Sequence, residues 1–263
     1  MSFALAIGSG ALVGLILALV GGGGSILAVP LLIYVVGVSS PHVAIGTGAV
    51  AVAGSTLAGL IAHGRRGTIK WRCALVFSAA GIVGALAGSS LAKITDGQLL
   101  LALFGLLMLV VGVNMLLRRG DAGDEGVVLT WLNARELAPR LIVIGFGVGA
   151  LSGFFGIGGG FLIVPGLMLA TAMPLLNAVG TSLVAVFSFG AATASNFAIS
   201  GLVDWPIAAF FVGGGALGGI LGAWLSRRLA GSRDALRLVF AGVVIAASFY
   251  VLWRSILALG IIA

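Results

Sequence analysis

Two similar stretches of the sequence combine glycine, serine and proline in a pattern that could bind an anion. "GGGGSILAVPLL" occupies 21–32 and "GIGGGFLIVPGL" occupies 156–167, and each places its glycines directly before an apolar run. A helix that begins at such glycines inside a membrane leaves about four backbone N–H groups without partners, and hydrocarbon supplies no water for them. Their partial positive charge favours an anion without any basic side chain. The candidate binding residues are Gly23, Gly24, Ser25, Gly158, Gly159 and Gly160. The alternative is that these glycines only permit close helix packing or a tight turn.

A second group of candidates carries hydroxyl and amide side chains within apolar segments. Thr47 in "AIGTGAV" and Thr181 in "AVGTSLV" occupy the same place in two similar segments, Ser182 follows the second, and Asn196 lies deep in its own segment. Such groups can replace a substrate's hydration without the cost of burying a charge. We therefore expect Thr47, Thr181, Ser182 and Asn196 to line the substrate site. Alternatively, the hydroxyls bond back to carbonyl groups of their own helices.

Other reactive side chains give no pattern typical of an enzyme. The apolar segments contain no carboxylate pair, no HExxH motif and no convincing Ser/His pair, so the sequence predicts no catalytic residues, no metal and no cofactor. His42 and His63 border long segments, and the sequence leaves open whether either takes part in proton coupling.

The composition indicates which elements must position these residues. Of the 263 residues, 60% are hydrophobic and 8% are charged, and the mean hydropathy is +1.26, whereas about a quarter of the residues in soluble proteins are charged. Several apolar runs are long enough to cross a hydrocarbon core of roughly 30 Å. These runs are 3–20, 43–62, 73–91, 98–117, 178–199, 206–225 and 235–253, with a slightly shorter one at 140–155. The sequence predicts an all-α polytopic protein whose partner is the lipid bilayer, and its basic residues set orientation rather than bind nucleic acid.

The chain is a duplication with an offset of 134 to 135 residues. Pro30 falls on Pro165, and "GTIKW" (67–71) falls on "GLVDW" (201–205). We therefore expect a first transmembrane repeat at 1–117, a linker at 118–139 and a second repeat at 140–263, with about five hydrophobic segments in each repeat. One segment of each repeat is short, at 26–37 and 161–172, and twelve helical residues span only about 18 Å. These segments are predicted to be half-helices that begin inside the membrane.

Two further patterns concern helix packing and orientation. "GALAG" (84–88) and "GGILG" (218–222) are small-xxx-small patterns, which bring helices together. Suppose that the N-terminus is outside and that the first long run and the half-helix of each repeat form a hairpin that returns to its starting side. Twelve basic residues then lie in the cytoplasm, and only Lys93 and Arg254 lie outside. The basic loops 63–72, 118–139 and 226–237 are then cytoplasmic, and the two repeats have inverted topology.

The duplicated glycine and proline stretch, followed by "AIGTGAV" or "AVGTSLV", a "G…W" loop and a glycine-rich helix, resembles the TauE/SafE family of sulfite and organosulfur-anion permeases. The resemblance covers nearly the whole chain except the linker. It implies a secondary transporter of the bacterial inner membrane that moves a small anion, such as sulfite or an organosulfonate, by alternating access. One departure is that the first repeat reads "GTGAV" where the second reads "GTSLV", so only the second repeat has an additional hydroxyl after its threonine, at Ser182.

Several alternatives stay open at this point. The same sequence features would suit an anion channel or a structural membrane subunit. The sequence does not determine which anion is carried, the direction of transport, the coupling ion or the oligomeric state, for which a homodimer is one candidate.

Overall fold

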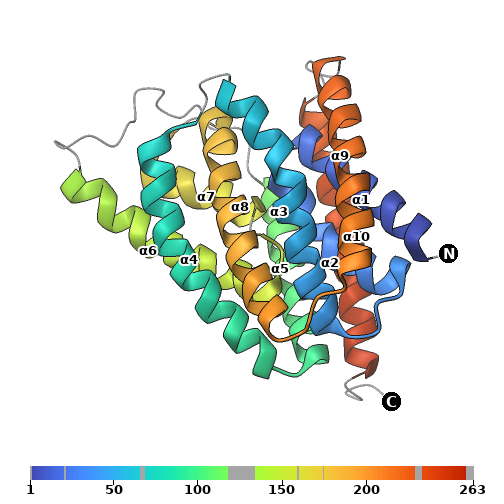
Figure 1. Ribbon diagram of the computed structural model, residues 1–263. Helices are drawn as coiled ribbons and strands as arrows, with labels where there is room; N and C mark the ends of the chain where they lie inside the picture. The colour runs from blue at the N-terminus through green and yellow to red at the C-terminus, as the bar shows by residue number, and fades with distance from the viewer. Residues whose placement is uncertain are drawn as a thin grey trace.

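The computed structural model describes residues 2–20, 22–65, 69–117, 134–158, 160–173, 175–228 and 233–258. The regular structure of these residues is entirely helical, which confirms the all-α prediction (Figure 1). The helices are α1 (Ser2–Val20), the 3-10 helix η1 (Gly22–Leu27), α2 (Ala28–Leu31), the π-helix η2 (Leu32–Val36), α3 (Pro41–Arg65), α4 (Trp71–Ile94), α5 (Gly97–Leu117), α6 (Ala134–Phe155), α7 (Gly160–Thr171), α8 (Leu175–Ile199), α9 (Trp205–Arg228) and α10 (Arg233–Ala258).

The long helices have the lengths that a bilayer requires. Six described helices contain spans long and apolar enough to cross a membrane, in α4, α5, α6, α8, α9 and α10. The predicted run at 140–155 is longer than expected, because α6 already begins at Ala134, within the predicted linker. The rest of that linker, 118–133, lies outside the described residues.

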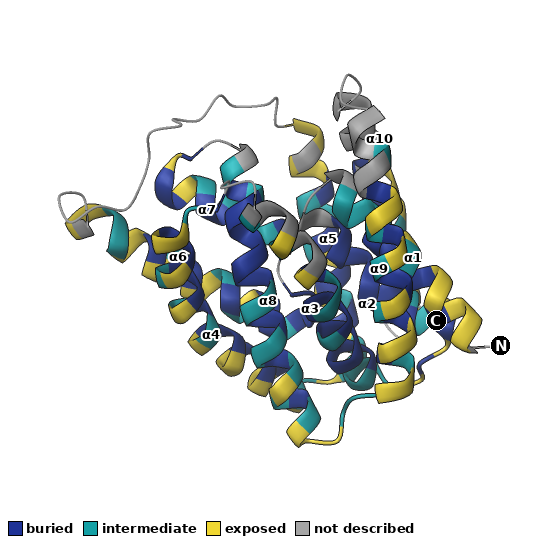
Figure 2. Ribbon diagram, turned by 45° about the horizontal axis from the view of Figure 1, so that its top comes forward, coloured by how far each residue is buried: buried dark blue, intermediate teal, exposed yellow. Residues whose placement is uncertain are grey.

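The outer surface of the bundle is apolar. Figure 2 shows exposed residues along the outward sides of α4 and α6, and many of them are large and hydrophobic. Val83 on α4, Val143 on α6 and Ile220 on α9 are 59%, 70% and 67% exposed. Apolar surface of this extent needs a cover, and lipid chains supply it.

Glycine contacts hold two helix pairs together at opposite sides of the bundle, α4 with α6 and α1 with α9 (Figure 1). A Cβ on Gly84 or Gly88 would overlap the carbonyl oxygen of Phe146 or Ala150, and a Cβ on Gly218 would overlap that of Ala11. The predicted packing role of "GALAG" and "GGILG" is therefore confirmed. In both pairs the contact positions rise together along the two helices, so each pair is parallel.

Two other pairs join equivalent helices of the two halves, and these pairs are antiparallel. Gly46 of α3 faces Phe197 of α8, whereas Gly190 of α8 faces Ala53 of α3. In the same way, Gly105 and Gly112 of α5 face Leu252 and Ile245 of α10. Each of these helices therefore runs opposite to its counterpart in the other half.

Both predicted short segments are present, but only the second is a regular α-helix. α7 covers Gly160–Thr171, within one residue of the prediction, whereas the first segment begins earlier, at Gly22, and is α-helical only over Ala28–Leu31. Pro30 lies within the α-helical turn Ala28–Leu31, and its counterpart Pro165 lies within the continuous helix α7, so proline does not account for the irregularity of the first segment. The two segments end alike, since Gly37 and Ala172, 135 residues apart, have left-handed φ values of 87° and 56°.

Candidate anion site

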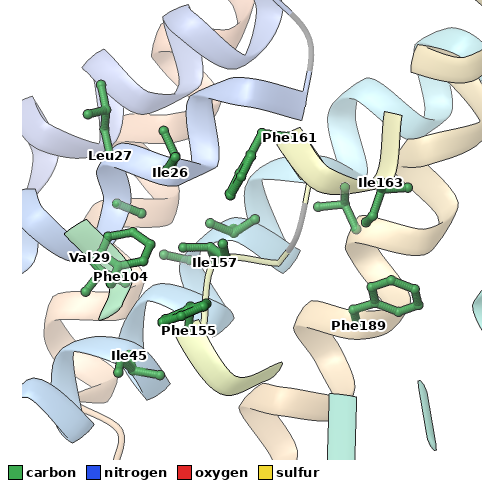
Figure 3. Packing of buried hydrophobic residues seen from close by; sticks show 14 of the residues in the cluster. Ile26, Leu27, Val29, Ile45, Phe104, Phe155, Ile157, Phe161, Ile163 and Phe189 are labelled. Carbon is green, nitrogen blue, oxygen red and sulfur yellow. The ribbon is translucent and has the colours of Figure 1, made fainter. Parts of the chain in front are cut away.

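The two short helices meet inside the bundle. η1 contacts α7, and residues within these two elements or in the turn before α7 are buried: Ser25 and Ile157 are 0% exposed, Ile26 is 1% and Phe161 is 6%. Figure 3 shows the side chains of Ile26, Ile157 and Phe161 gathered in one apolar region. The helix starts that the sequence singled out are thus close together and enclosed by hydrocarbon side chains.

Gly158 fixes the level at which α7 begins. Its φ is +61°, and a Cβ built on it would lie 2.6 Å from Val52 Cγ1 of α3 and 3.4 Å from Val186 Cγ1 of α8. These valines occupy equivalent positions, five residues after Thr47 and Thr181 respectively. Val52 and Val186 lie near the middle of α3 and α8, so the turn at Gly158 lies midway along both helices. Only glycine fits this turn without strain or overlap.

The other candidate glycines of the two stretches differ in their surroundings. A Cβ on Gly24 would lie 2.9 Å from Leu17 Cα and 3.0 Å from the Val13 carbonyl oxygen of α1, so this glycine at least permits close packing. Gly23 lies within η1, and Gly160 is buried as the first residue of α7. Gly159 lies outside the described residues.

Thr47 and Thr181 make a matched pair of bonds between the two halves. The Thr47 hydroxyl accepts the backbone N–H of Asp204 at 3.0 Å, and the Thr181 hydroxyl accepts the backbone N–H of Lys70, also at 3.0 Å. Lys70 and Asp204 are equivalent positions, each directly before its helix, α4 or α9. Each threonine is fully buried and holds the start of a helix in the opposite half. From the sequence we expected these hydroxyls either to line the substrate site or to bond to carbonyl groups of their own helices. The observed bond to a backbone N–H of the opposite half is a third arrangement.

The two threonines are not brought together. The contact of Gly46 with Phe197 puts Thr47 at about the level of Asn196 on α8. Asn196 lies 15 residues from Thr181 along that helix, which corresponds to about 22 Å of rise. One small anion cannot contact both hydroxyls at this spacing. Their predicted substrate-binding role is thus not visible as a shared site in this conformation.

Ser182 and Asn196 have different local partners. The Ser182 hydroxyl donates to the Val179 carbonyl of its own helix at 2.8 Å, which is the alternative that the sequence left open. Asn196 belongs to a polar cluster between α4 and α8. Its Nδ2 donates to Ser89 Oγ at 2.6 Å and Ser90 Oγ at 3.0 Å, while its Oδ1 accepts from Lys93 Nζ at 2.8 Å.

This Lys93–Asn196 cluster was missed by sequence reasoning. Lys93 Nζ also donates to Ser200 Oγ at 2.9 Å, so the lysine bridges one turn of α8. Ser89 and Lys93 are four residues apart on α4, as are Asn196 and Ser200 on α8. Residues four apart lie on the same face of a helix, so this matched spacing is the sequence signal from which a contact between the two polar faces could have been predicted.

His42 ties the start of α3 to the end of α4. Its Nε2 lies 3.1 Å from the Ala92 carbonyl oxygen and 3.0 Å from the Thr95 carbonyl oxygen, so Nε2–H is the donor. The bond satisfies carbonyls at a helix C-terminus. The side chain of His63 lies outside the described residues.

The family model for the sulfite exporter TauE/SafE matches residues 6–251. A "probable membrane transporter protein" of Xylella fastidiosa (strain 9a5c) is 52% identical over 254 residues, which are 97% of this chain and 96% of the relative. The chain belongs to the TauE/SafE family. A second relative, the "probable membrane transporter protein YunE" of Bacillus subtilis (strain 168), is 30% identical over 246 residues, which are 87% of this chain and 90% of the relative. The comparison with solved structures gave no significant match.

Membership in the TauE/SafE family makes this chain a multi-pass membrane protein of a transporter family. The family resemblance read from the duplicated motifs is confirmed. The matched region runs from α1 to α10 and so includes both short helices and both threonine bonds.

The threonine bonds predict a specific loss of stability. Thr47→Val and Thr181→Val leave a backbone N–H without its acceptor, and each should lower the free energy of unfolding by about 1–3 kcal/mol. Thr56→Val is the matched control, because this buried hydroxyl donates to the Val52 carbonyl of its own helix. The measurement is thermal unfolding in detergent. Equal midpoints for Thr47→Val, Thr181→Val and Thr56→Val would show that the cross-repeat bonds add nothing.

Proposed function

We propose that this protein is a secondary transporter of a small anion, with sulfite or an organosulfonate as the substrate, which it moves across the bacterial inner membrane by alternating access. The observation that carries the proposal is the meeting of η1 and α7, halfway along α3 and α8. Short helices that converge from two repeats are the usual pointer to the binding site of a secondary transporter.

The chemistry of this meeting point favours an anion. Helix starts present backbone N–H groups, and Ser25 adds a hydroxyl at the same place. The surrounding side chains, such as Ile26, Ile157 and Phe161, are apolar and strengthen such interactions by excluding water. Among the residues whose burial the structure describes, none of the buried ones there is a carboxylate or a basic residue. The family's printed description, a sulfite exporter, suggests the sulfur-containing class of anion.

The helix directions support inverted topology in the membrane. α3 and α8 are antiparallel, as are α5 and α10, although each pair consists of equivalent segments of the duplication. We propose that the two repeats cross the bilayer in opposite senses, with the basic loops 63–72, 118–139 and 226–237 in the cytoplasm. A rocking of one helix group against the other would then expose the η1–α7 region to each side in turn.

An anion channel is the main alternative, because channels also use helix ends to stabilise ions. A structural membrane subunit is a second alternative, although it would give the paired short helices no role. Transport kinetics separate these possibilities.

Reconstituted in liposomes, the purified protein should carry radiolabelled sulfite with saturable kinetics, and sulfite on the other side should drive counterflow. Ser25→Ala removes a hydroxyl at the proposed site and should raise the KM about tenfold or more, since a hydrogen bond to a charged group contributes about 1.5–3 kcal/mol. Ser188→Ala, which removes a hydroxyl that bonds to its own helix, is the control and should leave the KM unchanged. Flux that never saturates supports a channel, and an unchanged KM in Ser25→Ala rejects the site.

The inverted topology predicts opposite accessibility of equivalent loops. In a Cys73→Ala background, a cysteine at Leu202 should react with a membrane-impermeant maleimide added outside intact cells. A cysteine at the equivalent position, Thr68, should react only after the cells are opened. Equal labelling of the two positions in intact cells would contradict the proposed orientation.

A further inference from the structure

A pocket of about 480 Å³ lies at the end of the bundle where α3 and α5 begin and α10 ends. Its walls come from η2, the connection between η2 and α3, the start of α5 and the last turns of α10. Its polar residues are Tyr34, Ser39, Gln98 and Arg254, and its apolar wall includes Leu101 and Leu257. It is separate from the η1–α7 meeting point, whose buried residues do not line it.

The charged side chain among the described residues that line this pocket is positive. Arg254 is exposed on α10, and none of the described residues that line the pocket is a carboxylate. A guanidinium group presents several N–H donors in a planar fork that suits a phosphate or another oxyanion. Gln98 and Ser39 add neutral polar groups beside it. The pocket can therefore hold an anionic headgroup.

The size and the apolar wall indicate that the ligand is larger than the transported anion. Ligand pockets of about 300–1,000 Å³ take drug-sized molecules, and a small inorganic anion would leave most of this space empty. Most of the lining residues are apolar; Leu257 in the wall is 47% exposed, and Trp253, which neighbours Arg254 in α10, is 63% exposed. Exposed tryptophan at a helix end is typical of the membrane interface, where lipid headgroups lie.

The pocket also contacts an irregular part of the chain. Ile33 and Tyr34 belong to η2, a π-helix, and π-helical turns are rare and frequently lie at functional sites. The Tyr34 ring meets Tyr250 of α10 edge to face, with ring centroids 5.0 Å apart. A ligand seated between η2 and α10 would therefore fix the short segment whose other end, η1, touches α7.

We propose that this pocket binds an anionic membrane lipid, with its phosphate at Arg254 and an acyl chain along Leu101 and Leu257. Basic pockets between transmembrane helices on the cytoplasmic side bind anionic lipid headgroups, and the same chemistry applies at Arg254, which the proposed orientation puts at the outer side. The binding stabilises the η2–α10 contact. The assignment rests on the membrane location of the chain and not on which anion it transports.

The test measures thermal unfolding of the full-length protein, delipidated in a neutral detergent, with added lipid. Dioleoylphosphatidylglycerol should raise the midpoint by several degrees more than dioleoylphosphatidylcholine, which has the same chains and no net charge. Arg254→Gln should abolish that excess. Arg140→Gln, which removes an exposed arginine of α6 outside the pocket, should retain it.

Two further arms decide the outcome. Glycerol phosphate, which has the headgroup chemistry without acyl chains, should give no shift, and a shift equal to that of the lipid would overturn the lipid assignment in favour of a free anion. An equal effect of the two lipids, or an undiminished excess in Arg254→Gln, overturns the proposal altogether. If Arg254→Gln does not fold, Gln98→Leu takes its place and should reduce the excess. Sulfite flux measured in phosphatidylcholine liposomes is independent of these results, so failure of the lipid site and failure of the transport proposal are distinguishable.

Discussion

The fold depends on one constraint: a helix that starts inside a membrane protein must find partners for its first backbone N–H groups. The two short helices start at Gly22 and Gly160, and Ser25 and Phe161, close to these starts, are buried. Glycine contacts with neighbouring helices position these starts. Gly158 turns between Val52 and Val186, and Gly24 lets η1 approach α1. An anion is the partner that the proposed function supplies.

The same requirement explains the matched threonine bonds. α4 and α9 also need partners at their starts, and the backbone N–H groups of Lys70 and Asp204 obtain them from hydroxyls of the opposite half. The duplication thus uses one side chain twice to join its two copies. The Lys93–Asn196 cluster breaks this symmetry, because the position equivalent to Asn196 is Ala62. The α4–α8 contact and its counterpart, the α3–α9 contact, therefore differ chemically at this position.

The sequence predicted the features that depend on periodicity and composition. The helical spans, the short segment at α7 and the glycine packing of α4 and α9 follow from apolar run lengths and from small-residue spacing, which act locally. The partners of Thr47 and Asn196 did not follow, because they lie 157 and 103 residues away in sequence and depend on the register between helices. The 3-10 and π geometry of the first short segment was also missed: the glycines of η1 permit several backbone conformations, and η2, with the sequence LIYVV, carries no local signal for a π-helix.

The most direct test of the central claim is to locate the anion itself. Selenite resembles sulfite and gives an anomalous X-ray signal, so crystals grown with selenite should show a peak between η1 and α7, at the level of Val52 and Val186. The account predicts backbone N–H groups of the two short helices and the Ser25 hydroxyl within hydrogen-bonding distance of that peak. A selenium signal found only at the bundle ends, beside Lys93 or Arg254, would contradict the account.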